Sequence, residues 1–270
     1  MKDAWGRTIE YVRLSLTDAC NFCCPYCRPA EITPQSQHQL LSVDEWMTIL
    51  GAFHHVGVKA VRLTGGEPLL YPHIEDLLAR IKQTGWFEDI SMTTNGSLLA
   101  PRAAKLKELG LNRVNISLDS LDSDAFALCV GKANQLDSVL NGIQSAIDAG
   151  FTSVKINTVL SRHWTDDEVH DLLTYVETWP VIWRFIEYMP FQGDAFHGPT
   201  FDEWKAQLER VSGGILTENH GVYGFGPATY YNLPSGKEIG FIFSMSHSYC
   251  DTCNRVRLTS HGQMRLCLLR

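Results

Sequence analysis

The sequence has 270 residues and a formal net charge of −7, and 44% of its residues are hydrophobic. This length suits one large domain or a domain with an appendage, and the apolar content excludes a disordered chain. The acidic balance argues against nucleic acid or an anionic membrane surface as a partner. No apolar stretch reaches the roughly 18 residues of a membrane span, and no secretory signal is visible, so we expect a cytoplasmic protein.

Short β-like runs alternate with helical patterns through the first two thirds of the chain. The β-like runs lie at 11–17, 59–64, 89–95, 113–119, 153–159 and 182–188, and the helical patterns at 43–55, 73–84, 101–109, 135–149 and 166–178. Ser42 to Glu45 and Thr165 to Glu168 have the sequence of a capping box, and Gly110 and Gly150 suit helix C-caps. This alternation implies parallel strands. We therefore predict an α/β fold in which residues 1–190 form a partial (β/α)6 barrel.

The pattern changes after residue 190. Gly and Pro become frequent, and strands are expected at 222–231, 238–245, 255–258 and 264–267. We expect these strands to pair locally with one another. Residues 191–270 are therefore predicted to form a smaller β-rich region appended to the barrel.

One face of every predicted barrel strand is polar. The polar positions are Arg13, Ser15, Thr17, Arg62, Thr64, Ser91, Thr93, Asn95, Asn115, Ser117, Asp119, Lys155, Asn157, Arg184 and Tyr188. The alternate positions are apolar and suit packing on helices, which leaves the polar set for the lumen. A polar lumen must hold water or a ligand, and its basic residues indicate a polyanion. An antiparallel sheet with a solvated face is the alternative, and the intervening helices argue against it.

The eight cysteines fall into two groups of three, with Cys23 and Cys129 interpreted as spare thiols. The first group is Cys20, Cys24 and Cys27, and the second is Cys250, Cys253 and Cys267. Disulfides are rare in the cytosol, and clusters with short gaps are typical of metal or iron–sulfur ligands. Three thiolates would hold three irons of a cubane and leave the fourth open. A zinc site that also uses Cys23 is the alternative, which the adjacency of Cys23 and Cys24 disfavours.

The loops that follow the predicted strands carry the unusual residues. The first strand leads into the loop 20–27, the second into Gly65-Gly66-Glu67-Pro68, and the third into Asn95-Gly96. In β/α folds the chemistry lies at the C-terminal ends of the strands. We therefore expect the first cysteine group, the glycine turn and the polar lumen to meet at one edge of the sheet.

Several longer motifs occur in order along the chain. They are Arg13-Leu-Ser-Leu-Thr-Asp-Ala-Cys20, Arg62-Leu-Thr-Gly-Gly-Glu-Pro, Thr93-Thr-Asn-Gly, Asn115-Ile-Ser-Leu-Asp-Ser, Val154-Lys-Ile-Asn, Arg184-Phe-Ile-Glu-Tyr-Met-Pro and Cys250-x2-Cys253-Asn-Arg-Val-Arg-Leu-Thr. Together they resemble the radical S-adenosylmethionine (SAM) superfamily and, within it, the MoaA family of GTP 3′,8-cyclases. The resemblance covers the chain from about residue 7 to 270. It implies a radical SAM partial (β/α)6 TIM-like barrel, with a C-terminal region that carries a second [4Fe-4S] cluster.

The resemblance implies a lyase that converts GTP to (8S)-3′,8-cyclo-7,8-dihydroguanosine 5′-triphosphate, the first step of molybdopterin biosynthesis. SAM bound to the first cluster would yield a 5′-deoxyadenosyl radical that takes the ribose 3′ hydrogen, so the cofactor and not a side chain carries the chemistry. By motif position, the SAM contacts fall on Tyr26, Gly66, Ser117 and Met189. The GTP contacts fall on Arg13, Arg62, Thr93, Lys155, Arg184, Arg255, Val256 and Arg257. Arginine forks suit phosphate oxygens.

The resemblance also implies partners and exposes departures. The implied partners are GTP, an electron donor such as flavodoxin or ferredoxin, a cyclic pyranopterin monophosphate synthase that receives the product, and a second copy in a homodimer. Ala60 stands where the family usually has Lys, Tyr71-Pro72 stands where it has basic residues, and its C-terminal Gly-Gly tail is not part of this sequence. The alternatives are a radical SAM enzyme acting on another nucleotide or a peptide, and a non-catalytic metal-binding protein.

Overall fold

A curved β-sheet dominates the computed structural model, which describes residues 2–4, 6–27, 40–190, 198–221 and 223–267. Within these residues the sheet has 11 strands in the order β11-β10-β1-β2-β3-β4-β5-β6-β9-β8-β7. Its central strands are β1 (Tyr11–Ser15), β2 (Ala60–Thr64), β3 (Asp89–Thr94), β4 (Arg113–Ser117), β5 (Ser153–Val159) and β6 (Ile182–Ile186). Each pairs in parallel with the next. The prediction of six parallel strands is confirmed, with bounds within two residues of those expected.

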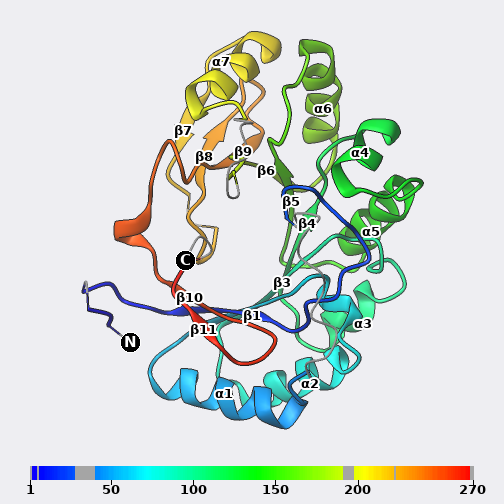
Figure 1. The fold of residues 1–270 in the computed structure, drawn as a ribbon. Helices are drawn as coiled ribbons and strands as arrows, with labels where there is room; N and C mark the ends of the chain where they lie inside the picture. Colours follow the sequence, from blue (N-terminus) through cyan, green and yellow to red (C-terminus); the bar gives the residue numbers. More distant parts are fainter. Residues whose placement is uncertain (1, 5, 28–39, 191–197, 222, 268–270) are drawn as a thin grey trace.

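Helices cover the convex side of this sheet (Figure 1). They are α1 (Val43–His55), α2 (Ile74–Thr84), α3 (Ala103–Glu108), α4 (Ser123–Val130), α5 (Leu136–Asp148), α6 (Asp166–Thr178) and α7 (Phe201–Ser212), with short 3₁₀ turns η1 (Pro68–Leu70) and η2 (Cys250–Thr252). The five helical patterns in the sequence correspond to α1, α2, α3, α5 and α6, whereas α4 and α7 were not expected. No described helix combines the length and apolar content needed to cross a bilayer.

Local capping chemistry explains where several helices begin. Capping boxes link Ser42 with Glu45 at α1 and Thr165 with Glu168 at α6, as predicted. A third capping box, Thr200 with Glu203, starts α7. The same sequence signal was therefore present for a helix that the periodicity did not reveal.

The C-terminal strands extend the barrel sheet at both edges, and the expectation of purely local pairing is wrong. Strand β9 (Glu238–Ile242) pairs in parallel with β6, and β10 (Arg255–Leu258) pairs in parallel with β1. Local antiparallel pairs then add β8 (Thr229–Asn232) and β7 (Thr217–Asn219) outside β9, and β11 (Met264–Arg265) outside β10. An open barrel leaves two strand edges with unpaired backbone groups, and this segment covers both. The segment 191–197, next to the expected domain boundary, lies outside the described residues.

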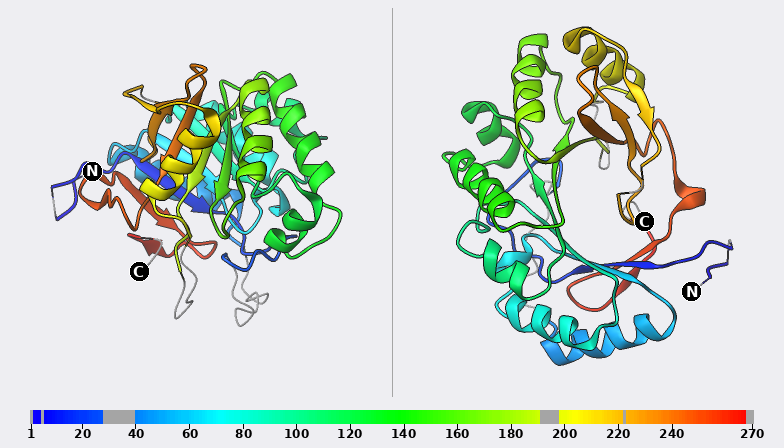
Figure 2. Two further views of the ribbon diagram at one scale, coloured as in Figure 1. Left: turned by 90° about the horizontal axis from the view of Figure 1, so that it is seen from above. Right: turned by 180° about the vertical axis from the view of Figure 1, so that it is seen from behind.

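The two faces of the sheet differ in polarity as the strand pattern predicted. Val12, Leu14, Val61 and Ile116 belong to the apolar core shared with the helices. The alternate side chains lie on the opposite, concave side of the sheet. Figure 2 shows that this side faces the middle of the molecule. Polar residues buried there include Arg62, Ser91, Asn115, Lys155, Asn157 and Arg184. The concave face is therefore a buried polar surface.

Candidate active site

The first cysteine loop packs against the glycine turn that follows β2. The backbone N–H of Gly66 donates to the carbonyl of Thr17 at 2.7 Å, and that of Glu67 donates to the carbonyl of Ala19 at 2.8 Å. A Cβ atom at Gly66 would lie 2.2 Å from the Ala19 carbonyl oxygen, closer than any real contact. Only glycine allows this approach, so the turn fixes the chain immediately before Cys20.

The buried carboxylate of Glu67 joins this turn to the end of β3. It accepts hydrogen bonds from the Thr94 hydroxyl at 2.7 Å and from the backbone N–H groups of Leu69 and Asn95 at 3.0 and 2.7 Å. The Asn95 side chain in turn donates to Asn21 Oδ1 at 2.8 Å. Three loops that are distant in the sequence are thereby held together at the C-terminal ends of β1, β2 and β3.

Asp119 ties the cysteine loop to the end of β4, a role the sequence did not reveal. The Tyr26 hydroxyl donates to Asp119 Oδ2 at 2.5 Å, and the Val159 N–H donates to Asp119 Oδ1 at 2.8 Å. Burial raises the pKa of Asp119 to about 6, although both hydrogen bonds favour its ionised form. Burial, followed by the charge of Asp119, also raises the pKa of Tyr26. Tyr26 is thus held through its hydroxyl group.

The four residues implied for SAM lie at this same edge of the sheet. Gly66 follows β2, Ser117 is the last residue of β4, and Met189 comes three residues after the end of β6. Tyr26 lies on the cysteine loop and contacts the residue two positions after Ser117. The parallel topology therefore brings the four positions to one end of the barrel.

The first cysteine group suits an iron–sulfur cluster in donor type. All eight cysteines are described, and none forms a disulfide. Burial, followed by the charges of Asp119 and Cys27, raises the pKa of Cys24 to about 12, so the thiolate needs a bound cation to form. Thiolates are the ligands that iron–sulfur clusters prefer. Among the described residues, no three His, Cys, Asp or Glu side chains already surround one point at metal distance. The first cysteine group therefore suits a cluster in its donor atoms and in its position on the loop.

Cys23 is fixed by a different part of the structure from its neighbours. Its backbone N–H donates to the Val130 carbonyl at 2.9 Å, and its Cβ lies against Gly131, the C-cap of α4. Cys129 is buried within α4.

We expect Cys23→Ser and Cys129→Ser to retain the iron content and the SAM cleavage of the unmutated protein. Iron analysis after anaerobic reconstitution checks this, and loss of the first cluster in Cys23→Ser would contradict our choice of ligands.

The second cysteine group lies at the other end of β1. Cys250 belongs to η2 and Cys253 follows it, just before β10 begins. Strand β11 runs antiparallel to β10 and pairs Met264 with Leu258 and Arg265 with Arg257. The chain therefore returns toward the start of β10 before it reaches Cys267. This hairpin explains how a cysteine 14 positions after Cys253 rejoins the same end of the sheet.

Cations surround this second group. Arg7 Nη1 donates to the Cys250 carbonyl at 2.8 Å. Although burial opposes it, hydrogen bonds and charge from Arg255 lower the pKa of Cys253, and the charge of Arg7 adds to this effect. A lowered pKa favours the thiolate that binds a metal. The donor chemistry of the second group therefore also suits a cluster.

Strand register places the expected substrate cations in rows on the concave face. One row crosses five strands and contains Arg257, Arg13, Arg62, Ser91 and Arg113. A second row contains Thr93, Asn115 and Lys155, and Arg184 lies beside Asn157 in a third. Arg113 was not among the expected site residues, although it lies on the same face of β4 as Asn115. The sheet thus brings polar residues of seven strands together on one surface.

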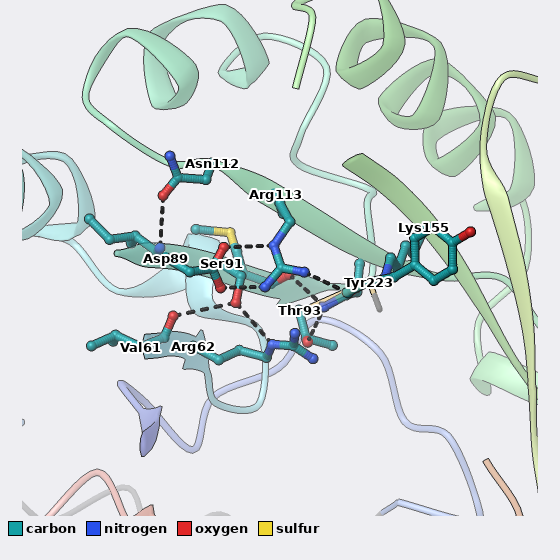
Figure 3. A network of polar contacts seen from close by, with 12 residues as sticks. Val61, Arg62, Asp89, Ser91, Thr93, Asn112, Arg113, Lys155 and Tyr223 are labelled. Atoms are coloured by element: carbon teal, nitrogen blue, oxygen red, sulfur yellow. Dashed lines mark hydrogen bonds and ion pairs between the residues drawn. The ribbon is translucent and has the colours of Figure 1, made fainter. Parts of the chain in front are cut away.

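The buried cations on this surface bind neutral partners. Arg62 Nε donates to the Ser91 hydroxyl at 3.1 Å (Figure 3). Arg184 Nη2 donates to Asn115 Oδ1 at 2.8 Å and to Asn157 Oδ1 at 2.7 Å. Lys155 Nζ donates to the Tyr223 carbonyl at 2.7 Å and to the Tyr230 hydroxyl at 3.1 Å. Within the described part of the chain, neither arginine nor Lys155 forms a salt bridge.

Burial makes the charged forms of these side chains unfavourable. Burial, followed by the charges of Arg184, Arg113 and Arg62, lowers the pKa of Lys155 to about 6. Burial also lowers the pKa of Arg62 to about 9. Nε of Arg13 and Nε of Arg255 are buried and donate to no described residue. Buried charges are normally paired, so this surface has the properties of an anion site.

The remaining expected substrate residues lie nearby but differ in orientation. The Arg13 guanidinium lies 5.5 Å from the ring centre of Tyr11, and that of Arg255 lies 5.2 Å from the ring centre of Tyr249. The Val256 side chain packs in the apolar core, so only its backbone is available to a substrate. Ala60 is fully buried and pairs in register with Tyr11.

Two family models match the chain. The model of the radical SAM superfamily matches residues 14–176, and the Molybdenum Cofactor Synthesis C model matches residues 181–270. Together they cover nearly the whole sequence. The first cysteine group lies in the first matched region, and the second group lies in the second.

Relatives of known name match over the same length. The chain is 42% identical to the GTP 3′,8-cyclase 2 of Pseudomonas aeruginosa over 98% of this chain and 81% of that protein. It is 44% identical to the GTP 3′,8-cyclase of Trichodesmium erythraeum over 97% of this chain and 82% of that one. Among solved structures, it resembles SuiB of Streptococcus suis bound to S-adenosylmethionine, with a TM-score of 0.72. That comparison has 17% identity and covers 97% of this chain but 60% of SuiB, and it shows the fold alone.

Proposed function

The chain belongs to the GTP 3′,8-cyclase family of radical SAM enzymes, and we propose that its concave polar face binds the triphosphate of GTP for this reaction. The enzyme is a lyase that forms (8S)-3′,8-cyclo-7,8-dihydroguanosine 5′-triphosphate, the first step of molybdopterin biosynthesis. The observation that carries the proposed binding surface is the set of buried cations without counter-ions. A triphosphate supplies the negative charge that this surface lacks.

The cofactors are SAM and [4Fe-4S] clusters. Cys20, Cys24 and Cys27 would hold the first cluster, and Cys250, Cys253 and Cys267 the second. When bound, SAM and the first cluster supply the one-electron chemistry that starts the reaction. The protein's own contribution is to place the cofactor and substrate, with Gly66 and Glu67 fixing the first cysteine loop and the Asp119 carboxylate holding Tyr26.

The proposed binding residues form two sets, one for SAM and one for GTP. Tyr26, Gly66, Ser117 and Met189 would contact SAM at the C-terminal ends of the strands. Arg13, Arg62, Thr93, Lys155, Arg184, Arg255, Arg257 and the backbone of Val256 would contact GTP on the concave face. Residues 1–190 would thus form the SAM barrel, and residues 191–270 the region of the second cluster, with GTP between the two cysteine groups.

Other partners follow from the reaction. An external one-electron donor of the flavodoxin or ferredoxin type would reduce the first cluster, and cyclic pyranopterin monophosphate synthase would consume the product. Such donors and the GTP pool support a cytoplasmic location. A homodimer would leave the concave site intact, because all the residues assigned to it come from one chain.

An anaerobic assay with SAM, reductant and GTP tests the proposed function. We expect formation of 5′-deoxyadenosine that depends on GTP, together with the cyclised nucleotide as product. ATP, CTP and a peptide substrate serve as controls for the other reaction classes of the superfamily. Equal stimulation by ATP and GTP, or stimulation by the peptide alone, would contradict the assignment.

Lys155 is expected to make GTP binding dependent on pH. Its pKa of about 6 in the ligand-free protein reflects burial and then Arg184, Arg113 and Arg62, while Glu238 acts in the opposite direction. A bound polyphosphate favours the ammonium form and raises this pKa, so binding takes up a proton. GTP affinity should therefore fall as pH rises from about 7 to about 8.5, above the last phosphate pKa of about 6.

The slope of this pH dependence approaches about tenfold per pH unit if one proton is taken up. Calorimetry in two buffers with different ionisation enthalpies measures the uptake directly. Lys155→Gln should bind GTP more weakly and show no uptake in this pH range. Equal uptake by the variant and the unmutated protein would assign the proton to another group.

A further inference from the structure

Residues 223–227, here called the floor segment, lie at the N-terminal end of the barrel. The Tyr223 carbonyl accepts hydrogen bonds from Arg113 Nη1 at 2.9 Å and from Lys155 Nζ at 2.7 Å. Arg113 is the first residue of β4, whereas the first cysteine loop follows the C-terminal end of β1. The floor segment therefore faces the concave surface from the end opposite to the first cysteine loop. Figure 3 shows Tyr223 beside Arg113 and Lys155.

A buried ion pair holds Arg113 in place. Its Nε donates to Asp89 Oδ1 at 2.6 Å, and its Nη2 donates to Asp89 Oδ2. Both side chains are 13% exposed. Because the Asp89 carboxylate balances its charge, Arg113 differs from the uncompensated cations Arg62, Lys155 and Arg184. An N–H group of Nη1 donates to the Tyr223 carbonyl and fixes the floor segment, so we treat Arg113 as a positioning residue.

The floor segment fits closely against these side chains. Gly224 has φ +101°, and a Cβ atom there would lie 2.0 Å from Arg113 Nη1. The next residue, Phe225, stacks on Tyr11 with ring centres 6.3 Å apart and an interplanar angle of 28°. The Tyr11 ring also lies 5.4 Å from the Arg62 guanidinium. The floor segment therefore supports cations of β2, β4 and β5.

At Lys155 the cationic surface meets the floor segment. Lys155 uses two of its three N–H groups on the Tyr223 carbonyl and the Tyr230 hydroxyl, which leaves one for a ligand. Beyond Lys155, an anion would meet the carbonyl oxygen of Tyr223, which accepts from both Lys155 and Arg113. This carbonyl oxygen carries a partial negative charge, so it repels a further phosphate.

We propose that the floor segment limits the phosphate chain of the bound nucleotide, with Arg113 as the positioning residue that keeps the Tyr223 carbonyl against Lys155. This proposal rests on the GTP site proposed above. It assigns to the floor segment the selectivity of that site for the number of phosphates. The terminal phosphate of GTP would contact Lys155. A fourth phosphate would have to displace Tyr223.

Nucleotide titrations of the reconstituted protein without reductant test the proposal. The ligands are GMP, GDP, GTP and guanosine 5′-tetraphosphate, and the variants are Gly224→Ala and the double variant Asp89→Asn/Arg113→Gln. The double variant removes both charges, which avoids an isolated buried carboxylate. We expect GTP binding to weaken by roughly threefold to tenfold, as for one lost hydrogen bond, while GMP and GDP affinities stay unchanged. The tetraphosphate should bind the variants more tightly than it binds the unmutated protein.

Arg113→Lys is the conservative control and should retain more GTP affinity than the double variant, since it keeps a cation beside Asp89. Iron content and SAM affinity should be the same in all variants, and Gly224→Ala keeps the test valid if the double variant does not fold. If the variants bind all four nucleotides more weakly by the same factor, the site is loosened in general and the proposal is overturned. An unchanged ratio of GTP affinity to GDP affinity would also overturn it. Failure of the unmutated protein to bind GTP would instead overturn the proposed function.

Discussion

Replacing Cys20 by alanine is expected to remove one of two iron–sulfur clusters and to abolish SAM cleavage. The unmutated protein should contain about eight iron atoms after anaerobic reconstitution, and Cys20→Ala about four. Cys253→Ala should also lose about four iron atoms, because its group lies at the opposite end of β1 and depends on a different hairpin. The reason is that each cluster has three proposed thiolate ligands, so the loss of one leaves only two to hold it.

Iron analysis, together with electron paramagnetic resonance of the reduced protein, separates the two clusters. Cys23→Ser is the matched control, since it changes a thiol on the same loop without a proposed ligand role. Retention of SAM cleavage by Cys253→Ala in the absence of GTP would support separate roles for the two groups. A single cluster in the unmutated protein would contradict the assignment of the C-terminal cysteines.

Arg184→Gln, Lys155→Met and Arg62→Ala are expected to weaken GTP binding while leaving the ligand-free protein at least as stable. Loss of one buried, charge-assisted partner costs about 1.5–3 kcal/mol, or roughly 10- to 150-fold in affinity. Burial lowers the pKa of all three side chains, so keeping Arg62 and Arg184 charged, or Lys155 neutral at pH 7, costs folding free energy that the variants recover. We therefore expect the melting temperature of the ligand-free variants to stay the same or rise by about 2–4 °C for each kcal/mol gained.

These opposite effects distinguish a binding role from a structural one. Calorimetry with GTP gives the affinity, and differential scanning calorimetry of the ligand-free protein gives the stability. Arg80→Ala is the control, because Arg80 forms an exposed ion pair with Asp44 on the helical side of the molecule. A marked fall in melting temperature together with unchanged GTP affinity would show that the buried cations stabilise the fold and do not bind the substrate.

The sequence predicted the barrel accurately because its signals were local. Alternation of polar and apolar residues, as in Arg13 and Leu14, indicated both the strands and their polar face, and Ser42 and Thr165 indicated helix starts. Helix α4 was missed because it has only eight residues, and α7 because only its capping box marked it. Pairing of β9 and β10 was misjudged because strand partners are set by exposed edges far away in the sequence.

The sequence by itself determined the family, the two cysteine groups and the polar concave face, since spacing and parity are properties of neighbouring residues. Only the tertiary structure decided how these parts are arranged. It placed the cysteine groups at opposite ends of β1, because β10 adds to the barrel edge and β11 turns back beside it. It also revealed the Tyr26–Asp119 contact and the contact of Tyr223 with Arg113 and Lys155, which join residues 93, 110 and 68 positions apart. Such contacts depend on the closure of the sheet, and no local pattern encodes them.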